Sequence, residues 1–245
     1  MKLANYTTVT CIHNEHQYIG SCLQSILNQT RKPAKTIVVL DRCTNGSETE
    51  VAKYPIDLVI CKDKVGSWNN SMSENLELAW KHVKSPFYAI VDADTILPPD
   101  YFETLLRNVG DTVIVSGQIV TDSPNLLGKL VKLWERTYKF APIGRYPRGC
   151  ALMISRDFID EIGGFPDMPA FETELIKQAQ TKGKGVTIVP QTKAYHARKL
   201  TISNVVARQI RSGKARRQQH WPLWKTILHA IFRFRPFVLW GYFLG

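Results

Sequence analysis

Short apolar runs alternate with segments of helical spacing through the first half of the chain. The runs predict strands, which we place at Thr7–Ile12, Thr36–Leu40, Asp57–Ile60 and Phe87–Val91. Between them, apolar residues recur three or four positions apart, as expected of helices, over Glu15–Leu27 and Trp68–Val83. Such alternation predicts an α/β fold with a mostly parallel central sheet and helices on both faces.

A sheet of this kind binds ligands beyond the carboxyl ends of its strands. The loops that begin at His13, Asp41, Lys62 and Asp92 each follow a predicted strand. We therefore expect these four loops to share one edge of the sheet.

The second half of the chain is less regular. The pattern predicts strands at Thr112–Val120, Arg148–Ile154 and Gly185–Val189, and helices at Pro124–Phe140, Asp157–Ile162 and Glu172–Lys182. Beyond residue 200 it predicts two further helices, Thr201–Gln218 and Trp221–Trp240. Since no repeat or low-complexity linker intervenes, we expect one domain over residues 1–200 and C-terminal helices over 201–245.

Composition agrees with a single α/β domain. A chain of 245 residues with 44% hydrophobic residues has enough apolar side chains for a sizeable core. The five cysteines are scattered without metal-binding spacing, which is typical of thiols in a reducing compartment, and we expect Cys11 and Cys150 in the core. The sequence shows neither a signal peptide nor a transmembrane stretch, so a cytoplasmic location is expected.

Charge is distributed very unevenly. After Glu174 the chain holds 14 Lys and Arg residues and no acidic residue, whereas the preceding part holds 18 basic and 21 acidic residues. The segment after Glu174 thus has a net charge of +14, whereas the part of the chain up to Glu174 has a net charge of −3. This asymmetry suggests an anionic partner for the C-terminal segment, such as membrane lipid, nucleic acid or phosphate.

The last predicted helix combines apolar and basic residues. Its apolar positions at helical spacing are Trp224, Ile227, Leu228, Ile231 and Phe232, with Arg233 and Arg235 following. The pattern fits a helix that lies on an anionic membrane surface, which would make the protein peripheral at the inner face of the membrane. The alternative is a helix packed on the protein body with some exposed Lys and Arg residues.

Candidate chemistry begins at Asp92-Ala93-Asp94, which directly follows the apolar run Phe87–Val91. Two carboxylates at a strand end offer hard oxygen ligands, which suit Mg²⁺ or Mn²⁺ bridging to substrate phosphates. The alternative is a turn whose Asp residues cap and solvate it.

Several motifs together resemble the nucleotide-sugar glycosyltransferases of family 2, which have the GT-A fold. The resemblance covers roughly Thr7 to Val189. It is carried, in the order of the family, by Thr8–Glu15, Ser25–Thr30, Ile37–Asp41, Asp92–Asp94, Leu97–Tyr101, Gly149–Ile154, Ile162–Phe165 and Phe171–Leu175.

The resemblance implies roles for residues at the strand ends. It makes Asp94 the direct metal ligand, while Asp92 reaches the ribose, or the metal through water. Asp41 would hydrogen-bond the nucleobase, unless it caps a turn. Asn14 and Glu15 would lie near the nucleoside, with capping of the following helix as the alternative for Glu15.

Further roles concern the chemical step and the diphosphate. Glu172 is implied as the general base, although the family usually has Glu-Asp where this chain has Phe171-Glu172; the alternative is a first-turn residue favoured by the helix dipole. His196 would contact the metal or diphosphate, or be structural. Arg211 would neutralise diphosphate, or be solvated or lipid-facing, and its surroundings lack the Trp of processive members.

The resemblance therefore implies a metal-dependent inverting glycosyltransferase that uses Mn²⁺ or Mg²⁺. It would move a sugar from a nucleotide-diphosphate sugar to a hydroxyl of a glycan or lipid-linked acceptor. One alternative is a sugar nucleotidyltransferase, but its Gly-rich basic signature is missing after the first strand. The other is a basic nucleic-acid-binding protein, but no such motif accompanies the basic tail, so no nucleic acid is expected.

Overall fold

The computed structural model describes residues 4–136, 146–147 and 149–245, which form two compact units. The first unit comprises the described residues of Met1–Val120 and Tyr146–Ala197. The second comprises those of Thr121–Arg145 and Arg198–Gly245, so it joins a mid-chain segment to the C-terminal helices.

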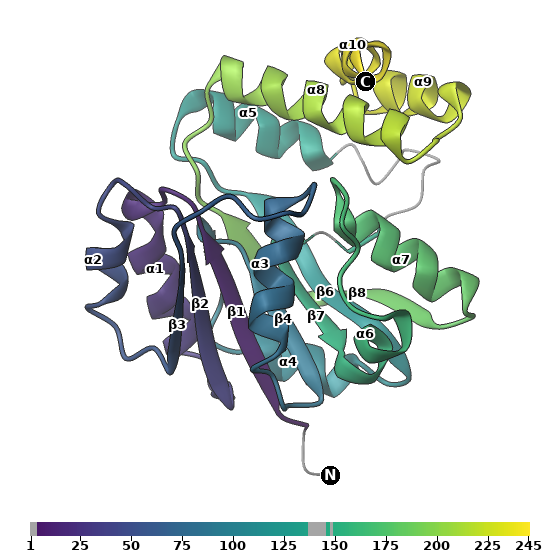
Figure 1. Ribbon diagram of the computed structural model, residues 1–245. Helices are drawn as coiled ribbons and strands as arrows, with labels where there is room; N and C mark the ends of the chain where they lie inside the picture. The colour runs from purple at the N-terminus through teal and green to yellow at the C-terminus, as the bar shows by residue number, and fades with distance from the viewer. Residues whose placement is uncertain (1–3, 137–145, 148) are drawn as a thin grey trace. The chain divides into compact units, whose positions relative to one another are not determined.

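The first unit is built on one sheet in which, among the described residues, eight strands follow the order β3-β2-β1-β4-β7-β6-β8-β5 (Figure 1). Strands β1 (Tyr6–Ile12), β2 (Lys35–Asp41), β3 (Leu58–Lys62) and β4 (Phe87–Val91) are parallel to one another. Their carboxyl ends, and hence the four loops singled out in the sequence, share one edge as predicted.

The other half of the sheet is antiparallel. Strand β7 (Ala151–Ser155) runs antiparallel to both β4 and β6 (Thr112–Thr121), and β8 (Gly185–His196) runs antiparallel to the two-residue β5 (Thr95–Ile96). The α/β prediction is confirmed, and the parallel arrangement holds for the first four strands. Antiparallel pairs need no helical crossover, so strand–helix alternation does not reveal them.

Helices cover both faces of this sheet, as predicted. Alternate residues of each strand point to opposite faces, so Val38 joins one apolar core while Val39 joins the other. Helices α1 (His16–Leu27), α2 (Ser47–Val51) and α4 (Tyr101–Asn108) contribute to the first core. Helices α3 (Ser71–Trp80), α6 (Arg156–Ile162) and α7 (Phe171–Thr181) contribute to the second (Figure 1).

Some elements differ from the sequence prediction. The short elements α2, α4 and β5 were not predicted, and β8 continues to His196 instead of ending at Val189. The apolar run ends at Val189 because Pro190 follows. Pro190 is exposed, and a strand accommodates a proline at a position where the backbone N–H is not needed for a hydrogen bond to a neighbouring strand.

The second unit contains α5 (Leu126–Glu135), α8 (Ile202–Gln218), α9 (Leu223–Phe232) and α10 (Pro236–Leu244). The prediction of one helix over Trp221–Trp240 is wrong. Phe234 has a left-handed φ of 46°, and Arg235 leaves the helical region because it precedes Pro236.

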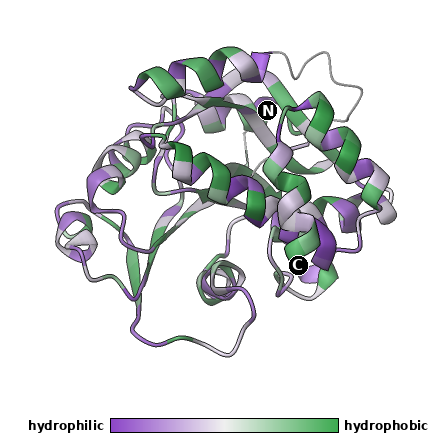
Figure 2. Ribbon diagram, turned by 90° about the horizontal axis from the view of Figure 1, so that it is seen from above, coloured by the Kyte–Doolittle hydropathy of each residue, from purple (hydrophilic) through white to green (hydrophobic). Residues whose placement is uncertain are grey.

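Hydropathy alternates along most helices, which is typical of helices with one buried face (Figure 2). Over the described ranges, every helix is too short or too polar to cross a bilayer.

Candidate metal and donor site

A tight turn follows β4. The Asp92 carbonyl accepts a hydrogen bond from the Thr95 amide at 2.9 Å, and the Cys22 thiol donates to the same carbonyl at 3.3 Å. The Asp92 amide in turn donates to the Cys150 carbonyl at 3.0 Å, which continues the antiparallel ladder beyond Val91 and Ala151. Asp92 and Cys150 therefore lie opposite each other at the end of the β4–β7 pair.

Pairing between β5 and β8 brings a histidine to this turn. Thr95 is the register partner of His196, and the Ala197 amide donates to the Asp94 carbonyl at 2.9 Å. The side chains also meet, since His196 Nε2 lies 3.2 Å from Asp94 Oδ1 and both are largely buried. Two main-chain contacts thus fix His196 beside the Asp-x-Asp turn.

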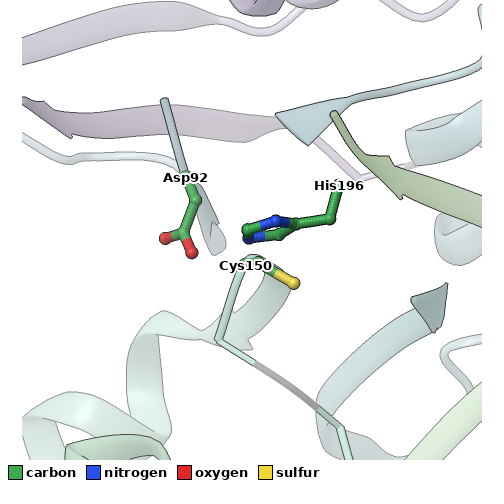
Figure 3. A group of neighbouring side chains, drawn as sticks. All are labelled: Asp92, Cys150 and His196. Atoms are coloured by element: carbon green, nitrogen blue, oxygen red, sulfur yellow. The ribbon is translucent and has the colours of Figure 1, made fainter. Parts of the chain in front are cut away.

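Donor atoms of Asp92, Cys150 and His196 all lie within 4.8 Å of one another. Figure 3 shows the three neighbouring side chains, which come from the residue after β4, the residue before β7 and the end of β8. With Asp94 at the His196 ring, carboxylate, imidazole and thiol donors meet within one small region. This donor chemistry fits a divalent cation.

Three of these four residues were singled out in the sequence, where Asp92, Asp94 and His196 were the expected metal ligands. The structure places His196 near Asp92 and in contact with Asp94. Cys150 was expected only as a core residue, and it is indeed buried. Its place beside Asp92 follows from the antiparallel β4–β7 register, which local sequence patterns do not indicate.

Asp41, the last residue of β2, is buried and surrounded by donors. It accepts hydrogen bonds from Arg42 Nε at 2.7 Å, Ser71 Oγ at 2.6 Å and Asn75 Nδ2 at 3.0 Å. Burial alone would raise the pKa of Asp41, but these hydrogen bonds and the charge of Lys62 outweigh it and hold the pKa well below its usual range.

Lys62, the last residue of β3, joins the same network. Its Nζ contacts the Glu74 carboxylate and lies 3.2 Å from both Ser71 Oγ and Asn75 Oδ1. The ends of β2 and β3 are thereby tied to the start of α3. A nucleobase that bonds Asp41 would have to replace one of the present donors, and that predicted role stays a prediction.

Asn14 and Glu15 lie at the end of β1, next to the loop after β2. Asn14 has a left-handed φ of 60°, and its Oδ1 accepts from the Thr44 amide at 2.8 Å. Glu15 is the N-cap residue of α1 but makes no side-chain cap bond; its amide donates to Ser47 Oγ at 2.9 Å. Non-glycine residues with positive φ concentrate where the surrounding structure holds them, often at functional sites.

Glu172 lies in the first turn of α7, at the same edge of the sheet. A Cβ placed on Gly149 would lie 3.7 Å from Glu172 Cδ, so this carboxyl packs against the residue before Cys150. Burial raises the pKa of Glu172. Glu174, by contrast, is engaged within its own helix, where it accepts from Gln178 Nε2 at 3.1 Å and pairs with Lys177 at 3.7 Å.

A polar contact not foreseen from the sequence orders two loops beside the site. The Asp167 carboxylate accepts from the Asn69 amide at 3.1 Å and the Asn70 amide at 2.9 Å. Asn70 also caps α3 by accepting from the Ser73 amide. The loop before α3 is therefore held to the loop before α7, which carries Glu172.

Arg211 lies in α8 of the second unit and is exposed. Its expected contact with diphosphate stays a prediction.

Solved structures share this fold. The mannosyltransferase PcManGT from Pyrobaculum calidifontis, solved with GDP-Man and Mn²⁺, aligns with a TM-score of 0.69 at 18% identity, over 97% of this chain and 69% of that one. Glucosyl-3-phosphoglycerate synthase from Mycobacterium tuberculosis, solved with Mn²⁺, UDP and phosphoglyceric acid, aligns with a TM-score of 0.59 at 15% identity, over 85% and 76% of the two chains. At such identities the likeness shows the fold, which is GT-A.

Sequence relatives agree. EpsH of Bacillus subtilis, which carries the name of a glycosyltransferase, is 27% identical over 114 residues, which cover 45% of this chain and 32% of EpsH. A glycosyltransferase of Haemophilus influenzae is 26% identical over 103 residues, which cover 41% and 31%. The chain thus matches about a third of the length of these relatives. Residues 7–155, more than half of the chain, match Glycosyl transferase family 2, and the chain belongs to that family.

Proposed function

We propose that this chain is a metal-dependent, inverting glycosyltransferase that takes a sugar from a nucleotide-diphosphate donor. The observation that carries the proposal is that His196 lies beside both Asp92 and Asp94 at one edge of the sheet. Glu172 packs beside Gly149 at the same edge. Family membership favours glycosyl transfer over the sugar nucleotidyltransferase and nucleic-acid-binding alternatives.

Asp92, Asp94 and His196 are the residues that would hold Mn²⁺ or Mg²⁺. Donor atoms of Asp92 and His196 lie within 4.8 Å of each other, His196 Nε2 lies 3.2 Å from Asp94 Oδ1, and similar folds have been solved with Mn²⁺. Bound there, the cation would neutralise the negative charge that develops on the departing diphosphate.

Glu172 would act as the general base. Its carboxylate takes the proton from an acceptor hydroxyl while that oxygen forms a bond to the anomeric carbon. The bond from that carbon to the diphosphate oxygen breaks on the opposite side, so the product has inverted configuration. The raised pKa of Glu172 suits this role, because a base is most effective when its pKa lies nearer the working pH.

The nucleoside would lie along the ends of β1 and β2, near Asn14, Glu15 and Asp41. These residues are held in place by the Thr44 and Ser47 contacts and by the Asp41 network. Similar folds bind GDP-Man and UDP, which supports a nucleoside diphosphate as the common feature of the donor.

The second unit would bind an anionic membrane surface. Most of the large hydrophobic side chains that are exposed in the described chain belong to this unit. On α9 and α10 they include Trp224, Ile231, Trp240 and Phe243, at 58%, 59%, 64% and 73% exposure. Exposed apolar area of this extent on an acid-free, basic segment fits a peripheral membrane helix rather than a protein interior.

Membrane binding suits an acceptor that is a lipid-linked or surface glycan at the cytoplasmic face. Replacing both Trp224 and Trp240 by Ser in the full chain should reduce sedimentation with vesicles containing anionic lipid, and salt should weaken binding of the wild type. Val65→Ser, at a 72% exposed position of the first unit, is the matched control. If the wild type ignores such vesicles at low salt, the membrane proposal is wrong.

The test of the enzymatic proposal is donor turnover. The purified protein would be incubated with a panel of nucleotide sugars, with Mn²⁺, Mg²⁺ or EDTA, and released nucleoside diphosphate would be measured. We expect release with at least one donor, dependent on the cation. A nucleotidyltransferase would instead release pyrophosphate from a nucleoside triphosphate and a sugar phosphate.

A further inference from the structure

The one donor at the metal cluster that the proposed function leaves unused is the Cys150 thiol. Within the described residues, Asp92, Cys150 and His196 are the group of three whose donor atoms approach within 4.8 Å (Figure 3). Cys150 is buried, with 6% of its surface exposed. The thiol is therefore largely shielded from bulk solvent, and its sulfur lies within 4.8 Å of donor atoms of Asp92 and His196.

The position of this thiol is fixed by the fold. The Asp92 amide donates to the Cys150 carbonyl, and the next residue along, Ala151, pairs with Val91 in the β4–β7 ladder. His196 is fixed by the β5–β8 ladder and by its contact with Asp94. Residues at or next to the ends of three separate strands thus place one sulfur, one nitrogen and one carboxylate within 4.8 Å of one another.

This donor set differs from one that selects Mn²⁺ or Mg²⁺. Those cations favour carboxylate, carbonyl and water oxygens, whereas thiolate and imidazole favour Zn²⁺, which commonly takes three protein ligands of the Cys, His and carboxylate types and leaves one position open. In addition, Mn²⁺ stands lowest among the divalent first-row metals in the general order of affinity for nitrogen, oxygen and sulfur donors.

We propose that Asp92, Cys150 and His196 form a thiolate-containing site that binds Zn²⁺, and its spectroscopic substitute Co²⁺, more tightly than Mn²⁺. On binding, Cys150 releases its proton to solvent and its sulfur bonds to the metal. The inference deepens the proposed function, on which it rests for one consequence only: Zn²⁺ would occupy Asp92 and His196 in competition with the activating cation and inhibit turnover.

The direct test is a Co²⁺ titration of the metal-free, reduced full-length protein, followed by absorbance. Thiolate coordination gives an intense sulfur-to-cobalt charge-transfer band in the near ultraviolet, which oxygen and nitrogen ligands do not give. We expect a band that saturates at one Co²⁺ per chain and disappears when Zn²⁺ is added. Cys150→Ser should abolish it, while Cys61→Ser, at an exposed thiol, should leave it unchanged.

Zinc affinity supplies a second readout by competition with a chromophoric chelator. Loss of a residue that merely orients a metal ligand typically weakens metal affinity about 10–100-fold. Cys150→Ser removes a ligand itself, so it should weaken zinc affinity by about tenfold or more. X-ray absorption of the zinc-loaded wild type tests the same bond without any variant, and should find one sulfur at about 2.3 Å.

A wild type without the charge-transfer band or without the zinc–sulfur distance overturns the inference, and so does a band that survives in Cys150→Ser. These results are independent of turnover. A protein that turns over a nucleotide sugar with Mn²⁺ but shows no sulfur ligation leaves the proposed function intact. A protein that shows sulfur ligation but turns over no donor leaves the inference intact.

Discussion

His196 Nε2 lies 3.2 Å from Asp94 Oδ1, although the two residues are about a hundred positions apart in the sequence. The contact exists because β5, the shortest strand of the sheet, pairs with the end of β8 immediately beyond the Asp-x-Asp turn. An imidazole and a carboxylate at this separation can be ligands of one cation. Their adjacency links the strand-end carboxylates to the last strand of the first unit.

Asp94→Asn should weaken metal-dependent nucleotide binding by about tenfold or more, since even supporting residues of metal sites cost 10–100-fold. The carboxamide keeps the side-chain shape, so the melting temperature should change little. Calorimetric titration of Mn²⁺ and nucleoside diphosphate measures the effect. Full activity of this variant in the presence of EDTA would contradict the assignment.

Glu172→Gln should lower the transfer rate by about a hundred- to ten-thousand-fold, because it removes the proton acceptor while keeping the shape. Donor and metal affinity should survive. Glu174→Gln is the matched control on the same helix turn, where the carboxylate accepts from Gln178 and pairs with Lys177. If transfer persists in Glu172→Gln but is lost in Glu174→Gln, the general base is Glu174 and not Glu172.

The pH dependence of transfer should report the same base. Burial raises the pKa of Glu172, and a base acts only when deprotonated, so kcat/KM should rise with pH through a pKa above the ordinary value of about 4.3. In Glu172→Gln this rising limb should vanish. If kcat/KM of that variant still rises with pH around the same midpoint, the rise reports the titration of another group.

Tyr101 supplies a stability test of the first unit. Its buried hydroxyl donates to the Ala151 carbonyl and accepts from the Gly117 amide, both at 2.8 Å, which joins α4 to β7 and β6. Tyr101→Phe leaves both main-chain groups without that partner and should lower the free energy of unfolding by about 1–3 kcal/mol. Denaturant titration measures it, and an unchanged midpoint would show that water or relaxation replaces the hydroxyl.

Local patterns predicted the parallel half of the fold well. Strands β1, β2 and β4 lie within one residue of their predicted bounds, because buried parallel strands are continuous apolar runs bounded by polar loops. The site residues at their ends follow directly from that geometry. Asp92 and Asp94 were identifiable because they end such a run.

The remaining site residues depend on long-range pairing. Cys150 reaches Asp92 only through the antiparallel β4–β7 register, and the apolar sequence around it is equally typical of a core residue. The β8 strand was predicted too short because Pro190 interrupts its apolar run, so its pairing with β5 was also missed. In the second unit, the break between α9 and α10 follows from Pro236. A prediction based on amphipathic spacing alone misses this break, because the apolar spacing continues across the proline.

We propose that Asp92, Asp94 and His196 together bind a divalent cation that also holds a nucleoside diphosphate. Calorimetric titration of the intact protein with UDP and GDP, in Mn²⁺ and then in EDTA, tests it without knowledge of sugar or acceptor. We expect measurable binding of at least one nucleotide in Mn²⁺ and its loss in EDTA. Failure of both nucleotides to bind in Mn²⁺, or binding that EDTA leaves unchanged, would contradict it.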